Sequence, residues 1–364
     1  MIEASPRWCL VIGSLRSGGT ERQVVGLANE LARRGERVSI AVIDGRLPSA
    51  YPIDARVAVE TLGRGGALGA IAAAWRLARL ARRSEIVYSF LDVANALSAF
   101  ATIGARARLV WGVRDSGPPV GAITRGALLL CRLLQARPDV LIGNAQGCLD
   151  FYARQRVLAR RRAVVANGID TAAWRPDADA RRSVREELGL DADAFLVGCV
   201  ARIDPKKRHD LLLAALAQCP RAVHLVLVGR GTDVRGGPID RQAHALAIAE
   251  RVHALGDRRD IARLTAAFDL ACCASDYEGF SNSLLEAIAA GVCCVASDIA
   301  GTRDVLGEAG TLVDNVATEW SRAITDLACD APRRARLAAA GRERALERFS
   351  MRAMADATLA AVRA

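Results

Sequence analysis

Lysine is nearly missing from this chain of 364 residues, although 50 of them are Lys or Arg. The only two lysines, Lys206 and Lys207, are adjacent, whereas the arginines are spread over the whole sequence. The net charge of +10 is therefore a weak indication of a polyanionic partner. Aromatic residues make up only 4% of the chain and do not alternate with basic residues, as they often do in nucleic-acid-binding surfaces. We expect no nucleic-acid partner.

Long apolar runs are missing as well. None reaches the roughly 18 to 20 residues that cross a bilayer as a helix. The N-terminus does not resemble a signal peptide, because Glu3, Pro6 and Arg7 precede only a short apolar stretch. We therefore expect a cytoplasmic protein without a transmembrane segment.

The sequence also lacks common metal-binding and nucleotide-binding motifs. Its ten cysteines form no Cys-x-x-Cys pair, and the doublets Cys272-Cys273 and Cys293-Cys294 lie in strand-like apolar segments. We interpret them as reduced core residues and predict no metal site and no cofactor. Neither G-x-G-x-x-G nor G-x-x-x-x-G-K-[ST] occurs, so a dinucleotide site or a P-loop is not predicted.

Strand-like and helix-like segments alternate along the chain, with a break at 167–170. Before the break we predict strands at 8–15, 37–43, 86–90, 108–113 and 140–143, and helices at 20–34, within 64–83, from 92 and at 123–135. After it we predict strands at 196–201, 223–228, 270–274 and 292–296, and helices at 180–188, 209–218, 240–254, 261–267 and between 281 and 291. This alternation predicts parallel sheets covered on both faces. The expected fold class is α/β, with two doubly wound Rossmann-like domains facing each other across a cleft and ligands beyond the carboxyl ends of the strands.

Two carboxylates, Glu278 and Glu286, lie in the segment 275–291 between two predicted strands. A residue among 281–283 can cap the helix of this segment and Gly291 can end it, which leaves backbone N–H groups at the helix start for an anionic group. A nucleotide sugar has a diphosphate flanked by two hydroxylated rings. The backbone amides can bind the diphosphate, and each of the two acids can bind the hydroxyl groups of one ring. In the alternative interpretation, Glu286 belongs to a capping box and Glu278 is an ordinary loop acid.

Two further loops are candidate phosphate-binding segments. Arg202 and Lys207 follow a predicted strand of the second domain, where a guanidinium can bind phosphate oxygens in pairs and an ammonium adds a compact charge. Gly18 and Gly19 begin a helix of the first domain and allow close approach of the backbone. The alternatives are a solvated basic loop and a plain tight turn.

The predicted helix within 64–83 is both apolar and basic. Trp75 and several aliphatic residues lie near Arg76, Arg79, Arg82 and Arg83. Such a helix can lie on an anionic membrane surface. The alternative is a helix packed on the sheet with a solvated arginine face.

Four segments in this order resemble those of one family, the retaining glycosyltransferases of the GT-B fold, family 4 (glycosyl transferases group 1). They are Gly18-Gly-Thr-Glu21, Asn167-Gly-Ile-Asp170, Ala201-Arg-Ile-Asp-Pro-Lys-Lys207 and Glu278-x7-Glu286, and the segment from Phe349 resembles the closing helix of the family. The resemblance covers nearly the whole chain. It implies an acceptor-binding domain over 1–166, a domain that binds the nucleotide sugar over 167–345, and a C-terminal helix over 346–364 that crosses back toward the first domain.

The resemblance also implies roles for single residues. Arg202 and Lys207 match the pair that binds the diphosphate, Glu278 the acid that faces the donor sugar, and Glu286 the acid that binds the ribose. The implied donor-binding set is Gly18, Gly19, Arg202, Lys207, Glu278, Gly279, Phe280, Ser281, Asn282, Ser283 and Glu286. The candidate catalytic residues are Glu278, Arg202, Lys207 and Asp115, and the candidates for acceptor binding are Arg114 and Asp115.

The chain departs from the family pattern at several positions. Arg208 replaces a usual glycine, and Ala274 and Cys293 replace usual prolines, which puts the geometry of the strand ends in question. The first-domain segment Trp111-Gly-Val-Arg114-Asp115-Ser116 has no histidine where many relatives carry one. Any step that depends on a histidine is therefore in question.

The implied reaction is transfer of a sugar from a nucleoside diphosphate sugar to an acceptor hydroxyl, with retention of anomeric configuration and without a metal. The resemblance and the basic helix together favour a lipid-linked or surface-polysaccharide intermediate as the acceptor. The basic helix favours a peripheral position on the inner face of the plasma membrane. The alternatives are a nucleotide-sugar epimerase of GT-B architecture and a catalytically inactive nucleotide-sugar-binding or membrane-adaptor protein. An oxidoreductase is the least favoured.

Overall fold

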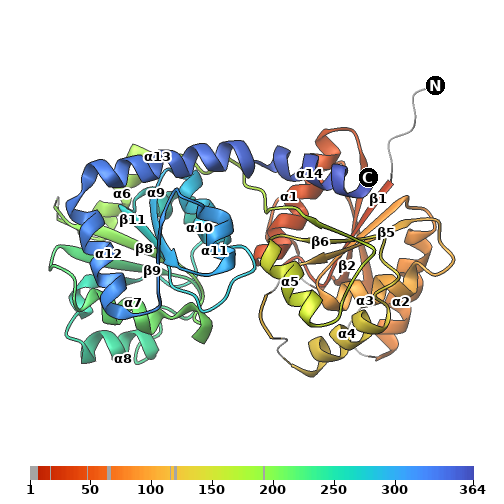
Figure 1. Cartoon of the computed structure of the whole chain (residues 1–364), viewed down its shortest axis with the longest axis horizontal. Helices are drawn as coiled ribbons and strands as arrows, with labels where there is room; N and C mark the ends of the chain where they lie inside the picture. Colours follow the sequence, from red (N-terminus) through yellow and green to blue (C-terminus); the bar gives the residue numbers. More distant parts are fainter. Residues whose placement is uncertain are drawn as a thin grey trace. The chain divides into compact units, whose positions relative to one another are not determined.

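A computed structural model describes residues 7–16, 18–46, 48–63, 67–114, 116–118, 121–191 and 193–364, except for the side chains of 67, 68 and 70. The chain forms two compact units (Figure 1). Unit 1 comprises Met1–Gly168 and Met351–Ala364, and unit 2 comprises Ile169–Ser350. The predicted boundaries were 166/167 and 345/346, and the second of these falls inside helix α13 (Ala331–Arg348). The ligand-binding roles predicted for these segments stay predictions.

Unit 1 contains a seven-stranded parallel sheet in the order β3-β2-β1-β4-β5-β6-β7. Its strands are β1 (Arg7–Ile12), β2 (Arg37–Asp44), β3 (Ala58–Gly63), β4 (Ile86–Phe90), β5 (Arg108–Val113), β6 (Val140–Gly143) and β7 (Arg161–Val164). Its helices are α1 (Gly19–Arg33), α2 (Ala67–Ala81), α3 (Asp92–Ala101), α4 (Ala122–Leu133), α5 (Gln146–Arg154) and α14 (Met351–Arg363). The chain continues from β1 toward one edge and resumes at β4 on the other side of β1, so the strand order reverses there.

The core of unit 1 forms because its central strands are apolar on both faces. From Trp8 to Ile12, β1 is buried throughout, as expected for a parallel strand covered on both sides by helices. Helix α14 adds Met354, Ala355 and Val362 to this core. The last helix of the chain therefore belongs to the fold of unit 1.

Unit 2 contains a six-stranded parallel sheet in the order β10-β9-β8-β11-β12-β13. Its strands are β8 (Phe195–Val200), β9 (Val223–Val228), β10 (Val252–Ala254), β11 (Leu270–Cys273), β12 (Cys293–Ser297) and β13 (Thr311–Val313). Its α-helices are α6 (Ala178–Glu187), α7 (His209–Leu216), α8 (Pro238–Ala245), α9 (Ile261–Ala266), α10 (Asn282–Ala289), α11 (Ala300–Leu306), α12 (Ala317–Cys329) and α13, and its short 3₁₀ helices are η1 (Pro205–Lys207) and η2 (Ala249–Arg251). The strand order reverses between β8 and β11.

The predicted α/β class with two doubly wound sheets is confirmed. Three elements of unit 1, β3, α5 and β7, were not predicted. Strand β3 exposes most of its residues and β7 alternates half-buried with exposed ones, so neither has the apolar run of a central strand. Both are edge strands of the sheet, where such exposure is common.

The predicted helix over 240–254 is wrong. Helix α8 ends at Ala245, and Val252–Ala254 form β10, which pairs with β9. Ala247 has a φ of 53°, which a continuing right-handed helix does not allow. The chain therefore turns there, so that Val252 can reach the sheet beside Leu225.

The spacing of Thr20 and Gln23 is typical of a capping box, but α1 has none. Helix α1 is capped by Gly18, without a side-chain hydrogen bond. The buried Gln23 amide binds Gly168 instead: Nε2 donates to the Gly168 carbonyl at 3.0 Å, and the Gly168 N–H donates to Oε1 at 2.8 Å. Gln23 thus ties α1 to the end of the first segment of unit 1.

The cysteine doublets are free thiols buried in β11 and β12, as predicted, whereas Cys329 at the end of α12 is exposed. Burial raises the pKa of Cys272 and Cys273, so these thiols stay protonated. In the described part of the chain, no helix combines the length and the hydropathy that crossing a bilayer requires.

Within the segment 64–83, the structure describes α2 from Ala67. Ala73, Leu77 and Ala81 are buried, so one face of the helix packs inside unit 1. Ile71 and Trp75, however, are 70% and 60% exposed. The Arg79 guanidinium lies 4.9 Å from the centre of the Trp75 ring. The outward face is therefore apolar as well as basic.

Candidate functional site

Two loops of unit 2 meet where its strand order reverses. β8 and β11 are hydrogen-bonded neighbours, and the loops that follow them carry the predicted residues Lys207 and Glu278. The Asp276 N–H donates to the Lys206 carbonyl at 2.9 Å, so the loops are joined through their backbones. In doubly wound sheets this reversal point is the usual ligand site.

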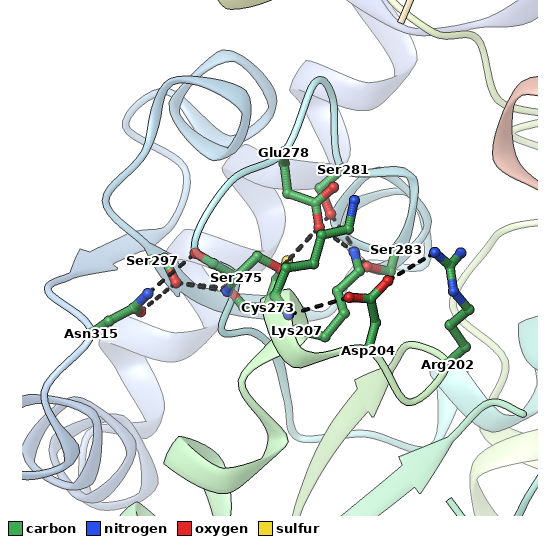
Figure 2. A network of polar contacts seen from close by, with 11 residues as sticks. Arg202, Asp204, Lys207, Cys273, Ser275, Glu278, Ser281, Ser283, Ser297 and Asn315 are labelled. Carbon is green, nitrogen blue, oxygen red and sulfur yellow. Dashed lines mark hydrogen bonds and ion pairs between the residues drawn. The ribbon is translucent and has the colours of Figure 1, made fainter. Parts of the chain in front are cut away.

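Lys207 and Glu278 form a close ion pair between Nζ and Oε1 (Figure 2). The two side chains are only 17% and 12% exposed. Ser275 Oγ donates to the same carboxylate oxygen at 2.9 Å. Burial by itself would lower the pKa of Lys207, but the Glu278 carboxylate outweighs burial and the pKa is raised. The ammonium is therefore charged at neutral pH.

Arg202 lies on the same side of unit 2 but is more exposed. Its Nη2 binds Asp204 Oδ2 (Figure 2). The two atoms lie 2.9 Å apart, and 56% of the Arg202 side chain is exposed. Asp204 also accepts from the Lys206 N–H at 3.3 Å and caps η1. Asp204 thus fixes the loop that carries both predicted cations.

The predicted helix start and its cap residue are confirmed, although the side chain of that residue makes no capping hydrogen bond. Ser281 is the N-cap of α10, and no side chain caps the helix. Its hydroxyl lies 3.3 Å from Ser283 Oγ and 3.4 Å from Cys273 Sγ instead. Gly291, with a φ of +73°, follows the end of the helix as predicted. The second predicted acid, Glu286, is buried in this helix.

Two close contacts, at Phe280 and at Gly301, support the loop. The Phe280 ring is buried and meets Phe349 edge to face, with 5.4 Å between ring centres. A donor contact at Phe280 would therefore come from its backbone. A Cβ on Gly301, in α11, would lie 2.3 Å from the Glu278 carbonyl oxygen. The start of α11 thus packs directly on the backbone of the loop.

The predicted glycines of unit 1 lie at the start of α1. The Tyr51 hydroxyl donates to the Gly18 carbonyl at 2.9 Å, and the Gly18 N–H lies 3.1 Å from the same hydroxyl. A Cβ on Gly18 would lie 2.2 Å from the Glu21 carboxylate, so the Glu21 side chain would have to move to admit one. Burial raises the pKa of Glu21. Gly19 is the first residue of the helix.

Arg114 follows β5 at the carboxyl edge of the unit 1 sheet. Its Nη1 donates to Asn167 Oδ1 at 2.5 Å, and its guanidinium lies 5.1 Å from the centre of the Phe90 ring. It forms no ion pair with a carboxylate of the described residues. Asp115, the other predicted acceptor-side residue, lies outside the described residues.

Sequence reasoning missed the residues that hold these side chains in place. Ser275, Ser297 and Asn315 form hydrogen bonds around Glu278, and Asp204 binds Arg202 (Figure 2). The role of Asp204 could have been predicted from the local sequence, because Asp before Pro at the start of a short helix is a common N-cap. The role of Asn315 could not have been predicted from the local sequence, since its partners Ser275 and Asp276 are distant in sequence.

The described residues contain no group of three or more His, Cys, Asp or Glu side chains arranged to hold a metal ion. The charged groups of the candidate site are side chains at the carboxyl edge of the unit 2 sheet. They are the Lys207–Glu278 pair, the Arg202–Asp204 pair and the buried Glu286. Such a set can bind an anion with its cations and hydroxyl groups with its carboxylates.

Two glycosyltransferase family models match the chain. Residues 17–173 match the family described as Glycosyltransferase Family 4, and residues 194–330 match Glycosyl transferases group 1. The chain is 34% identical to a D-inositol 3-phosphate glycosyltransferase of Segniliparus rotundus over 245 residues, which are 64% of this chain and 53% of that protein. It is 33% identical to a GDP-mannose-dependent alpha-(1-6)-phosphatidylinositol monomannoside mannosyltransferase of Mycolicibacterium smegmatis over 205 residues, 51% of this chain and 52% of that one. The chain thus spans about half the length of these curated relatives.

The fold resembles that of solved glycosyltransferases. The crystal structure of Anabaena HepE in complex with UDP and glucose matches with a TM-score of 0.84 and 24% identity, covering 98% of this chain and 99% of that one. At this identity the match concerns the fold. Together with the two family matches, it shows that the chain belongs to the GT-B glycosyltransferases of family 4 (glycosyl transferases group 1).

Proposed function

We propose that this glycosyltransferase moves a sugar from a nucleoside diphosphate sugar to an acceptor hydroxyl with retention of anomeric configuration. The observation that carries the proposal is the convergence of Lys207 and Glu278 beside Arg202 where the strand order of unit 2 reverses. The cations suit the diphosphate, and Glu278 suits the hydroxyls of the donor sugar. Glu286, on the helix that follows, suits the ribose. Relatives named as glycosyltransferases support this reading.

In the proposed reaction the bond between the anomeric carbon and the diphosphate oxygen breaks, and the acceptor oxygen bonds to the same face of that carbon. The departing phosphate oxygen takes the acceptor proton, so no protein base is required. Negative charge grows on the diphosphate as it leaves. Lys207 and Arg202 would stabilise that charge, which is the main electrostatic task of the reaction. No metal is needed, so EDTA should leave turnover unchanged.

The ion pair with Glu278 has a consequence for Lys207. A buried ammonium needs a counter-charge, and Glu278 supplies it. A bound diphosphate would supply a second one, which would free Glu278 to accept hydrogen bonds from sugar hydroxyls. The pair would thus prepare both groups for the donor.

For unit 1 we propose acceptor binding by Arg114 and Asp115. Among the described residues the Arg114 guanidinium is held by neutral partners, Asn167 and the Phe90 ring, which suits it to an anionic acceptor group. The relatives named above act on inositol phosphate or phosphatidylinositol compounds. We therefore propose a lipid-linked or surface-polysaccharide intermediate as the acceptor.

We further propose that unit 1 contacts the anionic inner face of the plasma membrane. The segment 64–83 contributes α2, whose Ile71 and Trp75 point outward. Helix α2 packs on α3, and α3 packs on α4 (Figure 1). Helix α4 exposes a second apolar set: Ile123, Leu129, Leu130 and Leu133. Across 67–83 and 121–137 the sequence has seven arginines and no Asp or Glu, which suits anionic lipid.

The membrane proposal is tested by co-sedimentation with vesicles of neutral or partly anionic lipid. Trp75→Ser combined with Leu133→Ser should reduce binding to the anionic vesicles. The matched control is Val316→Ser, an exposed apolar residue of unit 2. Equal binding to both vesicle types, or dimerisation through this surface in gel filtration, would contradict the proposal.

A thermal-shift screen with UDP-, GDP- and ADP-sugars identifies the donor, because a ligand that binds only the folded chain raises its melting temperature. The donor is then incubated with and without candidate acceptors. We expect a glycosylated product whose anomeric configuration, read by NMR, matches that of the donor. An altered sugar without acceptor would indicate an epimerase. Tight binding without a product under any acceptor would indicate an inactive binding protein.

A further inference from the structure

An asparagine outside the predicted site lies among the hydrogen bonds around Glu278 (Figure 2). Asn315 follows β13, Ser297 ends β12 and Ser275 follows β11, and these three strands are neighbours in the sheet. Ser297 Oγ donates to Asn315 Oδ1 at 2.6 Å. Asn315 Nδ2 donates to the Ser275 carbonyl and to Asp276 Oδ1, both at 3.2 Å. Adjacent strands thus bring these residues together at one edge.

The partners fix the orientation of the Asn315 amide. A carbonyl and a carboxylate only accept hydrogen bonds, so the NH₂ group must face Ser275 and Asp276, and the amide oxygen faces the Ser297 hydroxyl. The Ser275 N–H donates to Ser297 Oγ at 2.9 Å and closes a ring of three hydrogen bonds. Both backbone groups of Ser275 are therefore held by this ring.

The ring continues to the carboxylate of Glu278. Ser275 and Ser297 are buried, where hydrogen bonds are stronger than in water. Ser275 Oγ donates to Glu278 Oε1, the oxygen that also binds Lys207. Asn315 is thus connected through one residue, Ser275, to the acid of the candidate site.

We propose that Asn315 is a positioning residue for sugar transfer: by fixing Ser275 it holds the Glu278 carboxylate in the orientation that the donor sugar requires. The inference rests on the proposed function of Glu278. A catalytic group must be held to within about 0.5 Å by its supporting residues. Glu286 and Arg202 lie on other segments, so loss of the ring should leave nucleotide binding intact and lower turnover.

The test compares two substitutions at Asn315. Asn315→Asp keeps the size and the acceptor for Ser297 but loses the donor, and Asn315→Ala loses both. A change in exchange or in kcat that both variants share is caused by loss of the hydrogen-bond donor at Asn315 Nδ2. The matched control is Asn29→Asp in unit 1: Asn29 also bridges a loop with both ends of its amide, donating to the Pro52 carbonyl at 3.0 Å and accepting from the Asp54 N–H at 2.9 Å.

Three experiments are run: amide hydrogen exchange of the segment 274–280, steady-state kinetics that give the kcat and KM for donor turnover, and a binding measurement that gives the Kd of the matching nucleoside diphosphate. In both Asn315 variants we expect faster exchange and a kcat lowered about tenfold or more. The KM and the Kd should change by less than about twofold. The Asn29 variant should match the wild type in all three.

The readouts separate the possible failures. Unchanged exchange in both Asn315 variants would show that the ring does not hold the loop. Faster exchange with an unchanged kcat, or a Kd weakened as much as kcat falls, would overturn the positioning role. A wild-type chain that turns over none of the donors refutes the proposed function and the catalytic role together, while the exchange data still decide whether Asn315 holds the loop.

Discussion

At the scale of single residues, the two adjacent lysines differ sharply in their surroundings. Lys207 is buried against Glu278, whereas Lys206 lies over the Tyr277 ring, with 4.8 Å between Nζ and the ring centre. If Lys207 stabilises the leaving diphosphate, Lys207→Ala should lower kcat by about 10²- to 10³-fold, the usual cost of one lost oxyanion partner. Lys206→Ala is the control and should change kcat little.

The kcat of the Lys207 and Lys206 variants is measured by steady-state kinetics with the donor sugar that the thermal-shift screen identifies. A second variant, Lys207→Ala combined with Glu278→Gln, removes the buried carboxylate that the single variant leaves unpaired. If the double variant regained turnover, the single effect would come from the unpaired acid rather than from lost charge stabilisation.

The predicted site residues differ in how far the sequence could place them. Arg202, Lys207 and Glu278 follow apolar strands, so strand pattern alone indicates that they lie at the carboxyl edge of one sheet. Asn315, which binds the Ser275 carbonyl, could not be selected, because the order of strands β11, β12 and β13 decides which loops are neighbours. The spacing of two acids in a chain likewise does not say that one pairs with a lysine.

A pair of histidines at the edge of the unit 2 sheet predicts a dependence of stability on pH. His224 Nδ1 and His253 Nε2 lie 3.1 Å apart, and burial lowers the pKa of both, assisted by Arg251 for His224 and by His224 for His253. The unfolded chain therefore binds more protons than the folded one as the pH falls below about 6.5, the ordinary value for histidine. Stability is fully present above that pH and decreases below it.

The pH dependence is measured as the urea midpoint of unit 2 between pH 7.5 and pH 5. His253→Gln keeps a hydrogen-bonding group but cannot titrate, so it should flatten the decrease. The buried His209, whose pKa is also lowered, contributes a remaining slope. His244→Gln, at an exposed position, is the control. An equal slope in the wild type and in His253→Gln would contradict the assignment.

At the scale of elements, the site loops depend on glycines that admit close backbone contact. Gly301, in the first turn of α11, packs against the Glu278 and Gly279 carbonyls, and a Cβ there would lie 2.3 Å and 2.7 Å from their oxygens. Gly301→Ala must shift the loop, so we expect a loss of stability of about 1–3 kcal/mol and a lower kcat. Gly126→Ala, in α4 with no atom near the added methyl, is the control.

The Gly301 prediction is checked by urea unfolding together with donor turnover. A variant as stable and as active as the wild type would show that the loop accommodates the methyl without moving Glu278. A stable variant with a lower kcat would locate the effect in the loop geometry itself.

Helices and strands could be predicted where the local pattern of apolar residues allowed only one of the two. The apolar runs of β8 and β11 indicated buried strands because parallel strands are covered on both faces. The segment 240–254 was mistaken for one helix, since its helix-forming residues gave no sign of the left-handed turn at Ala247. Pairing of Val252 with β9 decided its structure, and such pairing is not visible in a local window.

At the scale of the whole molecule, unit 1 is built from two distant segments of the chain. Helix α14 supplies Met354 and Val362 to the core of unit 1, and Arg34 binds Asp356 at 2.5 Å. The Arg108 guanidinium donates to the Val362 carbonyl at 2.6 Å near the end of the chain. Unit 1 therefore cannot complete its core until α14 has been made, whereas unit 2 is continuous in sequence.

This arrangement predicts that a core substitution in α14 weakens unit 1 selectively. Met354 is buried, and Met354→Ala leaves a cavity that should cost about 2–5 kcal/mol. We expect faster hydrogen exchange in β1 and β4 and unchanged exchange in β8 and β9. The matched control, Leu327→Ala in the buried face of α12, should reverse the pattern, because Leu327 belongs to the core of unit 2. If either substitution accelerated exchange in both sheets equally, the two units would unfold as one cooperative body, and the segregation of their cores would carry no energetic meaning.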